Sequence, residues 1–206
     1  MIKTGIFIVA ISVFLISCAQ NDLETKTKSV TQELNQVSEL GAKAGNIPYD
    51  FAVLTTDGKT IILGDFLRNK KPVIVYFFAT WCPWCAKDFE ALSKVYKDYE
   101  DNVSIVAISL DLNEDLEIIS KYKKKYPALE KTMFAPGQME ILANYRVRKT
   151  TTKYAIGRDG KIMYAGLGAF NEGQWKTLLD ALVKSGEAKS AGNLPVTSKK
   201  VSVITK

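Results

Sequence analysis

The chain has 206 residues, of which 47% are hydrophobic and 24% charged, so a folded domain with a real core is expected rather than a disordered or fibrous chain. It contains no histidine and only three cysteines. This excludes Ser-His-Asp and Cys-His catalytic pairs, histidine-based metal sites and four-cysteine metal sites. The formal net charge of +6 is concentrated near the C-terminus, where residues 184–206 carry Lys184, Lys189, Lys199, Lys200 and Lys206 against Glu187. No arginine cluster or basic aromatic stripe accompanies it, so no nucleic-acid partner is expected, and residues 188–206 are interpreted as a basic, disordered tail.

The first residues have the pattern of a bacterial signal peptide. A short basic start is followed by an apolar run over residues 5–16, which as a helix spans roughly 18 Å, too short for a bilayer core of ~30 Å. The next residues, Leu15-Ile16-Ser17-Cys18, resemble a lipobox. This resemblance implies that residues 1–17 are removed and that Cys18 carries a lipid outside the cytoplasm. An ordinary cleaved signal peptide and an uncleaved anchor are the alternatives.

Residues 18–43 are polar and are interpreted as a flexible linker to a single domain over residues 44–187. The predicted elements follow in chain order, with no internal repeat: a hairpin (50–54 and 60–63), a buried strand (73–79), a helix (84–99), a buried strand (103–109), a helix (114–125), a short apolar segment (132–134), a helix (138–144), a second hairpin (154–156 and 161–164) and a last helix (172–185). This order predicts an α/β thioredoxin fold, a central mixed sheet flanked by helices, with an added N-terminal β-hairpin.

One motif carries recognisable chemistry. The segment Thr80-Trp81-Cys82-Pro83-Trp84-Cys85 lies where the central strand ends and a helix is expected to begin. At a helix N-terminus, unpaired N–H groups and the helix dipole favour the thiolate form of Cys82. Cys85, one turn further on, is expected to be more buried and to resolve the mixed disulfide that Cys82 forms. Half a zinc site would need two further ligands, and a purely structural disulfide at this spacing would be unusual.

The motif also carries a family resemblance. Residues 77–85, together with residues 145–147 and 154–161, resemble the thioredoxin-like TlpA/ResA/DsbE family, and the similarity extends over roughly residues 47–185. The resemblance implies an extracytoplasmic, membrane-anchored thiol:disulfide oxidoreductase. Cys82 and Cys85 are then its catalytic residues and Trp81, Pro83 and Trp84 their neighbours, with no cofactor and no metal.

Three positions near the motif depart from that family or from thioredoxins. The glutamate that often follows the second cysteine by three residues is Asp88 here. Its carboxylate could raise the pKa of the cysteines or pass a proton to Cys85; alternatively it is a solvated residue that complements the helix dipole. The helix proline of the family is Glu90, and Tyr76 stands where thioredoxins have an acid.

The largest departure lies in the loop expected to face the cysteines. The family's Thr-Pro-Thr, which contains a cis-proline, reads Thr150-Thr151-Thr152 here. A cis bond before a residue other than proline costs ~3 kcal/mol, so the bond is expected to be trans or strained. The hypothesis is that the N–H or hydroxyl of Thr151 stabilises the Cys82 thiolate; the alternative is that its side chain turns away.

The leading interpretation is a lipid-anchored monomer that reduces disulfides of secreted or membrane proteins. The resemblance implies a membrane electron donor of the CcdA/DsbD type and apocytochrome c as one substrate. A disulfide-forming oxidase and a non-catalytic or metal-carrying thioredoxin-like module are the alternatives. A peroxidase is disfavoured because the peroxiredoxin Thr-x-x-Cys pattern would require threonine at position 79, which is alanine.

Overall fold

The computed structural model describes residues 40–186, and a five-stranded sheet forms its centre. The strands lie in the order β5-β4-β3-β6-β7. Their bounds are β3 (Val73–Phe78), β4 (Ser104–Ser109), β5 (Met133–Ala135), β6 (Thr152–Ile156) and β7 (Ile162–Leu167). Strand β4 is parallel to β3 and β5, whereas β6 is antiparallel to β3 and β7. This mixed sheet flanked by helices confirms the predicted fold class.

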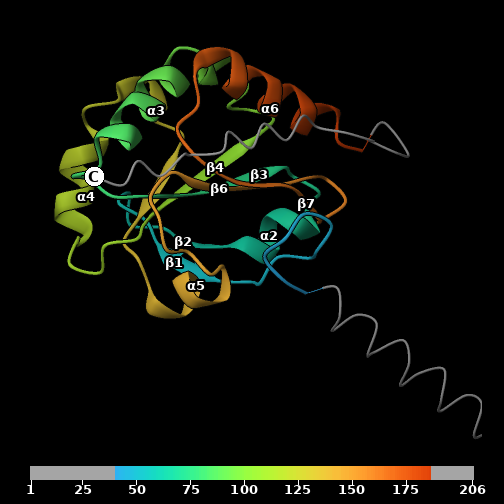
Figure 1. Ribbon diagram of the computed structural model, residues 1–206, viewed down its shortest axis with the longest axis horizontal. Coiled ribbons are helices and arrows are strands. Elements are labelled where there is room, and N and C mark those ends of the chain that lie inside the picture. The colour runs from blue at the N-terminus through green and yellow to red at the C-terminus, as the bar shows by residue number, and fades with distance from the viewer. Residues whose placement is uncertain (1–39, 187–206) are drawn as a thin grey trace, which may run out of the picture.

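Strand β3 separates two cores because successive side chains of a strand point to opposite faces of a sheet. Tyr76 enters the core formed with α3 (Pro83–Ser93), α4 (Leu116–Lys123) and α6 (Glu172–Lys184). Phe77 enters the other core, which contains residues of the hairpin β1 (Ala52–Leu54) and β2 (Thr60–Ile62) and of α2 (Leu63–Arg68) and α5 (Met139–Asn144). Figure 1 shows α3 and α6 on one side of the sheet, with the hairpin, α2 and α5 on the other. Burial on both faces explains why β3 is apolar throughout.

Two predicted elements differ from the structure. The helix expected over residues 84–99 ends at Ser93 and is followed by the 3₁₀ turn η1 (Tyr96–Asp98). This turn lets Tyr96 enter the core, where its hydroxyl donates to the Val103 carbonyl at 3.0 Å. Helix α2 is the second difference, because the sequence predicts that the preceding strand extends to Leu63, which is the first residue of this helix. The Asp50 carboxylate accepts a hydrogen bond from the Gly64 N–H at 2.8 Å, a long-range contact that no local pattern reveals.

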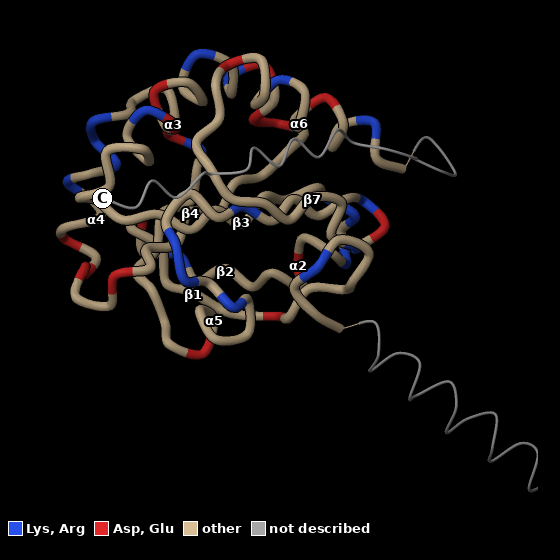
Figure 2. The backbone as a smooth tube through the Cα atoms, viewed as in Figure 1, with Lys and Arg blue, Asp and Glu red and all other residues tan. Residues whose placement is uncertain are grey.

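Several sequence predictions concern residues outside the described part of the chain. These are the signal peptide over residues 1–17, lipidation of Cys18, most of the linker and the tail over residues 188–206. At the end of the linker, Leu40 forms an isolated bridge with Ile47. Between residues 40 and 186, no helix is both long and apolar enough to cross a membrane. Acidic and basic residues are interspersed over α3 and α6 (Figure 2).

Candidate active site

The two cysteines of the motif lie where β3 gives way to α3, as the sequence predicts. Cys82 is the N-cap of α3, and its Sγ accepts a hydrogen bond from the Cys85 N–H at 3.2 Å. Pro83 occupies the first turn, where its missing N–H removes no helical hydrogen bond. An N–H donor and the positive end of the helix dipole therefore both face the Cys82 sulfur, an arrangement that stabilises a thiolate.

The second cysteine has a different environment. Both cysteines are free thiols and both are buried, with 3% of the surface of Cys82 and none of that of Cys85 accessible. Burial is the largest cause that raises the pKa of Cys85 to about 11, and its hydrogen bond with Cys82 adds to the effect. Cys85 is therefore a protonated thiol at neutral pH. This asymmetry agrees with an attacking Cys82 and a resolving Cys85.

The loop that faces Cys82 differs from the expectation in one respect. The Cys82 thiol donates to Thr150 Oγ1 at 3.1 Å, and in the thiolate form the Thr150 hydroxyl becomes the donor. The Thr151 hydroxyl instead donates to the Thr150 carbonyl at 2.5 Å and accepts from the Gly168 N–H at 3.2 Å. The hypothesis that the Thr151 hydroxyl stabilises Cys82 is therefore wrong, because that hydroxyl is held by other partners and Thr150 supplies the contact.

Thr151 has an unusual backbone. Its φ is 63°, in the left-handed region, and no peptide bond among residues 40–186 is cis. A β-branched residue is rarely found there because its side chain crowds the backbone. The loop thus reaches Cys82 by a trans, left-handed residue at the position where the family has a cis-proline.

Asp88 lies beneath the cysteines and is fully buried, so its interpretation as a solvated residue is wrong. Its Oδ2 accepts hydrogen bonds from the Tyr76 hydroxyl at 3.0 Å and from Lys153 Nζ at 2.5 Å. Its Oδ1 accepts from Trp175 Nε1 at 2.7 Å and from the Phe170 N–H at 3.0 Å. Four donors thus surround one carboxylate, which is the arrangement that a buried negative charge requires.

Sequence reasoning missed two members of this network. Lys153 lies on β6 and is fully buried, and Trp175 lies on α6. Burial lowers the pKa of Lys153, and the Asp88 carboxylate opposes this shift. A lysine directly before the apolar run of residues 154–156 was the signal available in the sequence, because a charge buried at such a position requires a partner.

A second buried carboxylate supports the segment before Cys82. Glu114 Oε1 accepts hydrogen bonds from the Thr80 N–H at 2.8 Å and from the Thr80 hydroxyl at 2.5 Å. Its Oε2 accepts from the Ser109 hydroxyl at 2.5 Å. Glu114 therefore ties the Cys82 loop to the end of β4. Sequence reasoning placed it only at the start of a helix.

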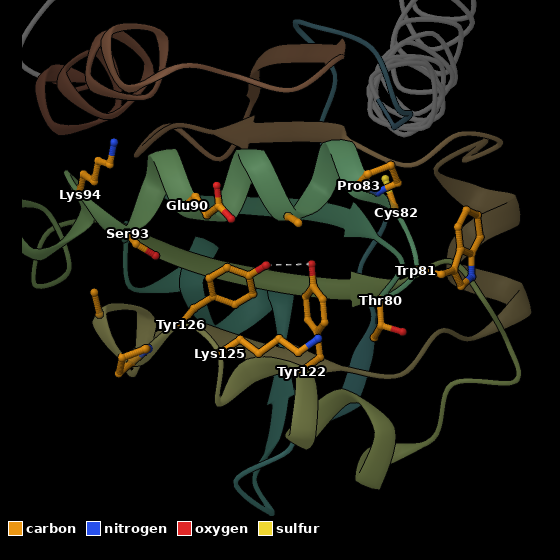
Figure 3. Close-up of a pocket in the computed structure, with 13 residues that line it drawn as sticks. Thr80, Trp81, Cys82, Pro83, Glu90, Ser93, Lys94, Tyr122, Lys125 and Tyr126 are labelled. Carbon is orange, nitrogen blue, oxygen red and sulfur yellow. Dashed lines mark hydrogen bonds between the residues drawn. The ribbon is translucent and has the colours of Figure 1, made fainter.

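A groove with a volume of about 760 Å³ opens at Cys82. It runs beside α3, past Glu90, to the 3₁₀ turn η2 (Pro127–Leu129). The Tyr126 hydroxyl donates to the Tyr122 hydroxyl at 3.2 Å in its wall (Figure 3). The groove gives an extended chain room to lie next to the Cys82 sulfur.

Two exposed tryptophans flank the first cysteine. Trp81 and Trp84 keep 62% and 61% of their surface accessible. The Trp81 indole N–H donates to the Asp111 carboxylate at 2.8 Å, and the Lys87 ammonium lies 4.8 Å from the centre of the Trp84 ring. Large exposed aromatic side chains at a reactive group are typical of a surface that binds another protein.

The arrangement offers thiol chemistry. Within residues 40–186 no group of three or more histidine, cysteine, aspartate or glutamate side chains is placed to hold a metal ion. A thiolate-stabilising helix N-terminus, a buried second thiol three residues later and an adjoining groove together provide what thiol–disulfide exchange requires.

Comparison with known proteins agrees with this chemistry. The model of the AhpC/TSA family matches residues 44–165. The thiol-disulfide oxidoreductase ResA of Bacillus anthracis is 32% identical over 130 residues, which cover 61% of this chain and 68% of that protein. ResA of Bacillus subtilis is 28% identical over 187 residues, which cover 90% of this chain and 94% of that protein.

Solved structures show the same fold. A putative protein disulfide isomerase from Bacteroides thetaiotaomicron superposes with a TM-score of 0.60 at 23% identity, over 71% of this chain and 92% of that one. A thiol:disulfide interchange protein from Chlorobium tepidum gives a TM-score of 0.58 at 21% identity, over 65% of this chain and 93% of that one. These structures show the fold, and the family model and the ResA relatives show that the chain belongs to the AhpC/TSA family, as a thioredoxin-like thiol-disulfide oxidoreductase of the ResA type.

Proposed function

We propose that the protein reduces disulfides of other proteins outside the cytoplasm, with Cys82 as the nucleophile and Cys85 as the resolving thiol. The observation that carries the proposal is the environment of Cys82 Sγ. It contacts the Cys85 N–H at 3.2 Å and Thr150 Oγ1 at 3.1 Å, and it adjoins an open groove.

The reaction transfers two electrons. The Cys82 thiolate attacks one sulfur of the substrate disulfide, so that a mixed disulfide forms and one substrate thiolate leaves and takes up a proton. Cys85 then loses its proton and attacks the Cys82 sulfur, which releases the second substrate thiol. The substrate has gained two electrons and two protons, and the protein holds a Cys82–Cys85 disulfide. A donor dithiol restores the reduced form by the reverse exchange.

The residues between the cysteines support the proposed direction of this exchange. Pro83 and Trp84 carry no charged group that could hold the Cys82 thiolate in the manner of a histidine at such a position. A less stabilised thiolate makes the dithiol a better reductant. A disulfide-forming oxidase is the alternative, and the reduction potential separates the two.

The location and the partners are part of the proposal. The segment Leu15-Ile16-Ser17-Cys18 supports a lipid on Cys18, which would tether the domain to the periplasmic or outer face of a bacterial membrane. We propose that a membrane dithiol protein of the CcdA/DsbD type supplies electrons. Secreted proteins, apocytochrome c among them, would be the substrates of the monomeric protein. The relatives named ResA support this assignment.

Trapping of the mixed disulfide tests the roles of the two thiols. With Cys85→Ser no resolving thiol remains, so incubation with a disulfide-bonded protein should accumulate a covalent complex through Cys82. With Cys82→Ser, little complex should form. Non-reducing gels and mass spectrometry of the cross-linked peptide measure both. Equal trapping by the two variants would void the assignment.

The lipid anchor is tested separately. The mature protein should fractionate with membranes, and Cys18→Ala should release it or leave it unprocessed. Intact mass spectrometry that finds an unmodified N-terminus at another residue would rule out the anchor.

A further inference from the structure

A lysine side chain connects the acid below the cysteines with the loop above them. Lys153 Nζ donates to Asp88 Oδ2 at 2.5 Å, to the Gly168 carbonyl at 2.8 Å and to the Thr151 carbonyl at 3.3 Å. An ammonium group has three N–H donors, and here each has an acceptor. The side chain is fully buried, so water does not compete for these positions.

The carbonyl that Lys153 holds belongs to the strained residue of the loop. Thr151 has a φ of 63°, a conformation that persists only where its surroundings hold it. Two groups do so: the Lys153 ammonium, and the Gly168 N–H, which donates to the Thr151 carbonyl at 3.3 Å and to its hydroxyl at 3.2 Å. The next residue towards the N-terminus is Thr150, whose hydroxyl contacts Cys82 at 3.1 Å.

The surroundings of Lys153 explain why its position is fixed. Its ammonium lies 4.6 Å from the centres of the Tyr76 and Phe170 rings and 5.3 Å from that of Trp175. Aromatic faces attract a cation, most strongly where water is excluded. The ammonium is thus confined by three rings, one carboxylate and two carbonyls, and it can hold Thr151 in one place.

We propose that Lys153 is a positioning residue for the thiol–disulfide exchange: by holding the Thr151 carbonyl, it places the Thr150 hydroxyl against Cys82. This inference rests on the proposed roles of Cys82 and Cys85. In this structure a buried ammonium anchored on Asp88 holds the loop at the position where the family has a cis-proline. Lys153 therefore stabilises the Cys82 thiolate without touching the sulfur, because it acts through the backbone from Thr151 to Thr150.

Alkylation of Cys82 tests the proposal, because its rate depends on the thiolate population and requires no substrate or electron donor. Thr150→Val removes the hydroxyl directly. It should slow alkylation at pH 7 about tenfold, the effect of one hydrogen bond to a charged sulfur. Lys153→Met keeps most of the length of the side chain but removes all three donors, and should slow the reaction by a similar factor. The pH midpoint of alkylation should rise in both variants.

The combination of the two substitutions is decisive. If Lys153 acts through Thr150, Thr150→Val in the Lys153→Met background should cause no further slowing. Independent effects, which would multiply to about a hundredfold, overturn the proposal. So does an unchanged rate in Lys153→Met. Lys176→Met, which removes an exposed positive charge from α6, is the matched control and should leave the rate as it is.

A second background keeps the test valid if Lys153→Met leaves Asp88 too poorly compensated to fold. Lys153→Met combined with Asp88→Asn removes both buried charges at once, which is better tolerated than removing one. The titratable groups that face Lys153 are Asp88 and Cys85 on α3, Cys82 at its N-cap and Tyr76 on β3, with Tyr164 on β7 close to Asp88. In this background too, Thr150→Val should cause no further slowing of Cys82 alkylation, and a tenfold slowing there contradicts the proposal. Because alkylation needs no exchange partner, this result is independent of the trapping experiment.

Discussion

The phenolic oxygen of Tyr76 lies 3.0 Å from Asp88 Oδ2, and the two side chains form a buried pair behind Cys85. Burial, together with the nearby Asp88 carboxylate, raises the pKa of Tyr76 well above its usual range, so its hydroxyl remains a donor. The same hydroxyl partly offsets the upward shift of the Cys85 pKa. A tyrosine thus stands between the carboxylate and the resolving thiol, at the position where thioredoxins have an acid.

Tyr76→Phe tests that relationship. Removal of the hydroxyl takes one donor from Asp88 and one stabilising contact from the Cys85 thiolate, so the pKa of Cys85 should rise further. The ¹³Cβ chemical shift of Cys85, followed against pH in a Cys82→Ser background, reports this thiol alone. An identical midpoint with and without the Tyr76 hydroxyl would show that the tyrosine has no influence on Cys85.

The raised pKa of Cys85 has a kinetic consequence. With a pKa of about 11, caused chiefly by burial, only a small fraction of this thiol is ionised at pH 7. Below the pKa the ionised fraction grows about tenfold for each pH unit, so release of a preformed mixed disulfide should accelerate about a hundredfold between pH 7 and pH 9. Stopped-flow measurement of the released substrate thiol checks this. A rate independent of pH over that interval would mean that Cys85 is already ionised.

The buried and exposed ion pairs should differ in their effect on stability. Asp88→Ala leaves the Lys153 charge buried without its partner, and should lower the free energy of unfolding by about 3–5 kcal/mol. Glu117→Ala breaks an exposed pair with Lys121 on α4, and should cost less than about 1 kcal/mol. Urea unfolding of both variants measures the difference. Similar losses of free energy of unfolding in the two variants would show that the buried Asp88–Lys153 pair contributes no more to stability than the exposed pair.

The left-handed backbone at Thr151 makes a specific substitution informative. Glycine adopts a φ of 63° without crowding, so Thr151→Gly should leave Cys82 alkylation within about twofold of the original rate. Proline is restricted to a φ near −65°, so Thr151→Pro must rearrange the loop and move the Thr150 hydroxyl. Its alkylation rate at pH 7 should fall several-fold. Equal alkylation rates in the two variants would show that the reactivity of Cys82 does not depend on the conformation of this loop.

The exposed tryptophans should act on substrate binding alone. Trp81→Ala and Trp84→Ala should each raise KM for a disulfide-bonded protein by about threefold to tenfold, because aromatic side chains contribute disproportionately to protein interfaces. Cys82 alkylation and the free energy of unfolding should remain unchanged in Trp84→Ala. Leu54→Ala, which removes an exposed apolar side chain from the hairpin, is the control. If KM is unaffected by either tryptophan, substrates bind elsewhere.

Local sequence patterns were sufficient to predict most of the fold, but not to predict the contacts that surround the cysteines. The apolar run of β3 and the position of Cys82 at a helix start could be read from neighbouring residues, since both depend on short-range periodicity and capping. The partners of Asp88 come from β3, β6 and α6 and from the segment before α6. Pairing over such separations is decided by tertiary packing. Thr150 and Thr151 are adjacent, and which hydroxyl faces the sulfur depends on a single φ angle that the sequence does not reveal.

The equilibrium between the dithiol and the disulfide of Cys82 and Cys85 tests the central claim most directly. Equilibration in glutathione or dithiothreitol buffers, with the oxidised fraction measured by mass spectrometry, gives a two-electron midpoint potential. A reductant of protein disulfides predicts a value near the ~−270 mV of thioredoxin. A value near the ~−120 mV of a strong disulfide-forming oxidant, or no disulfide between these two cysteines, would contradict the account.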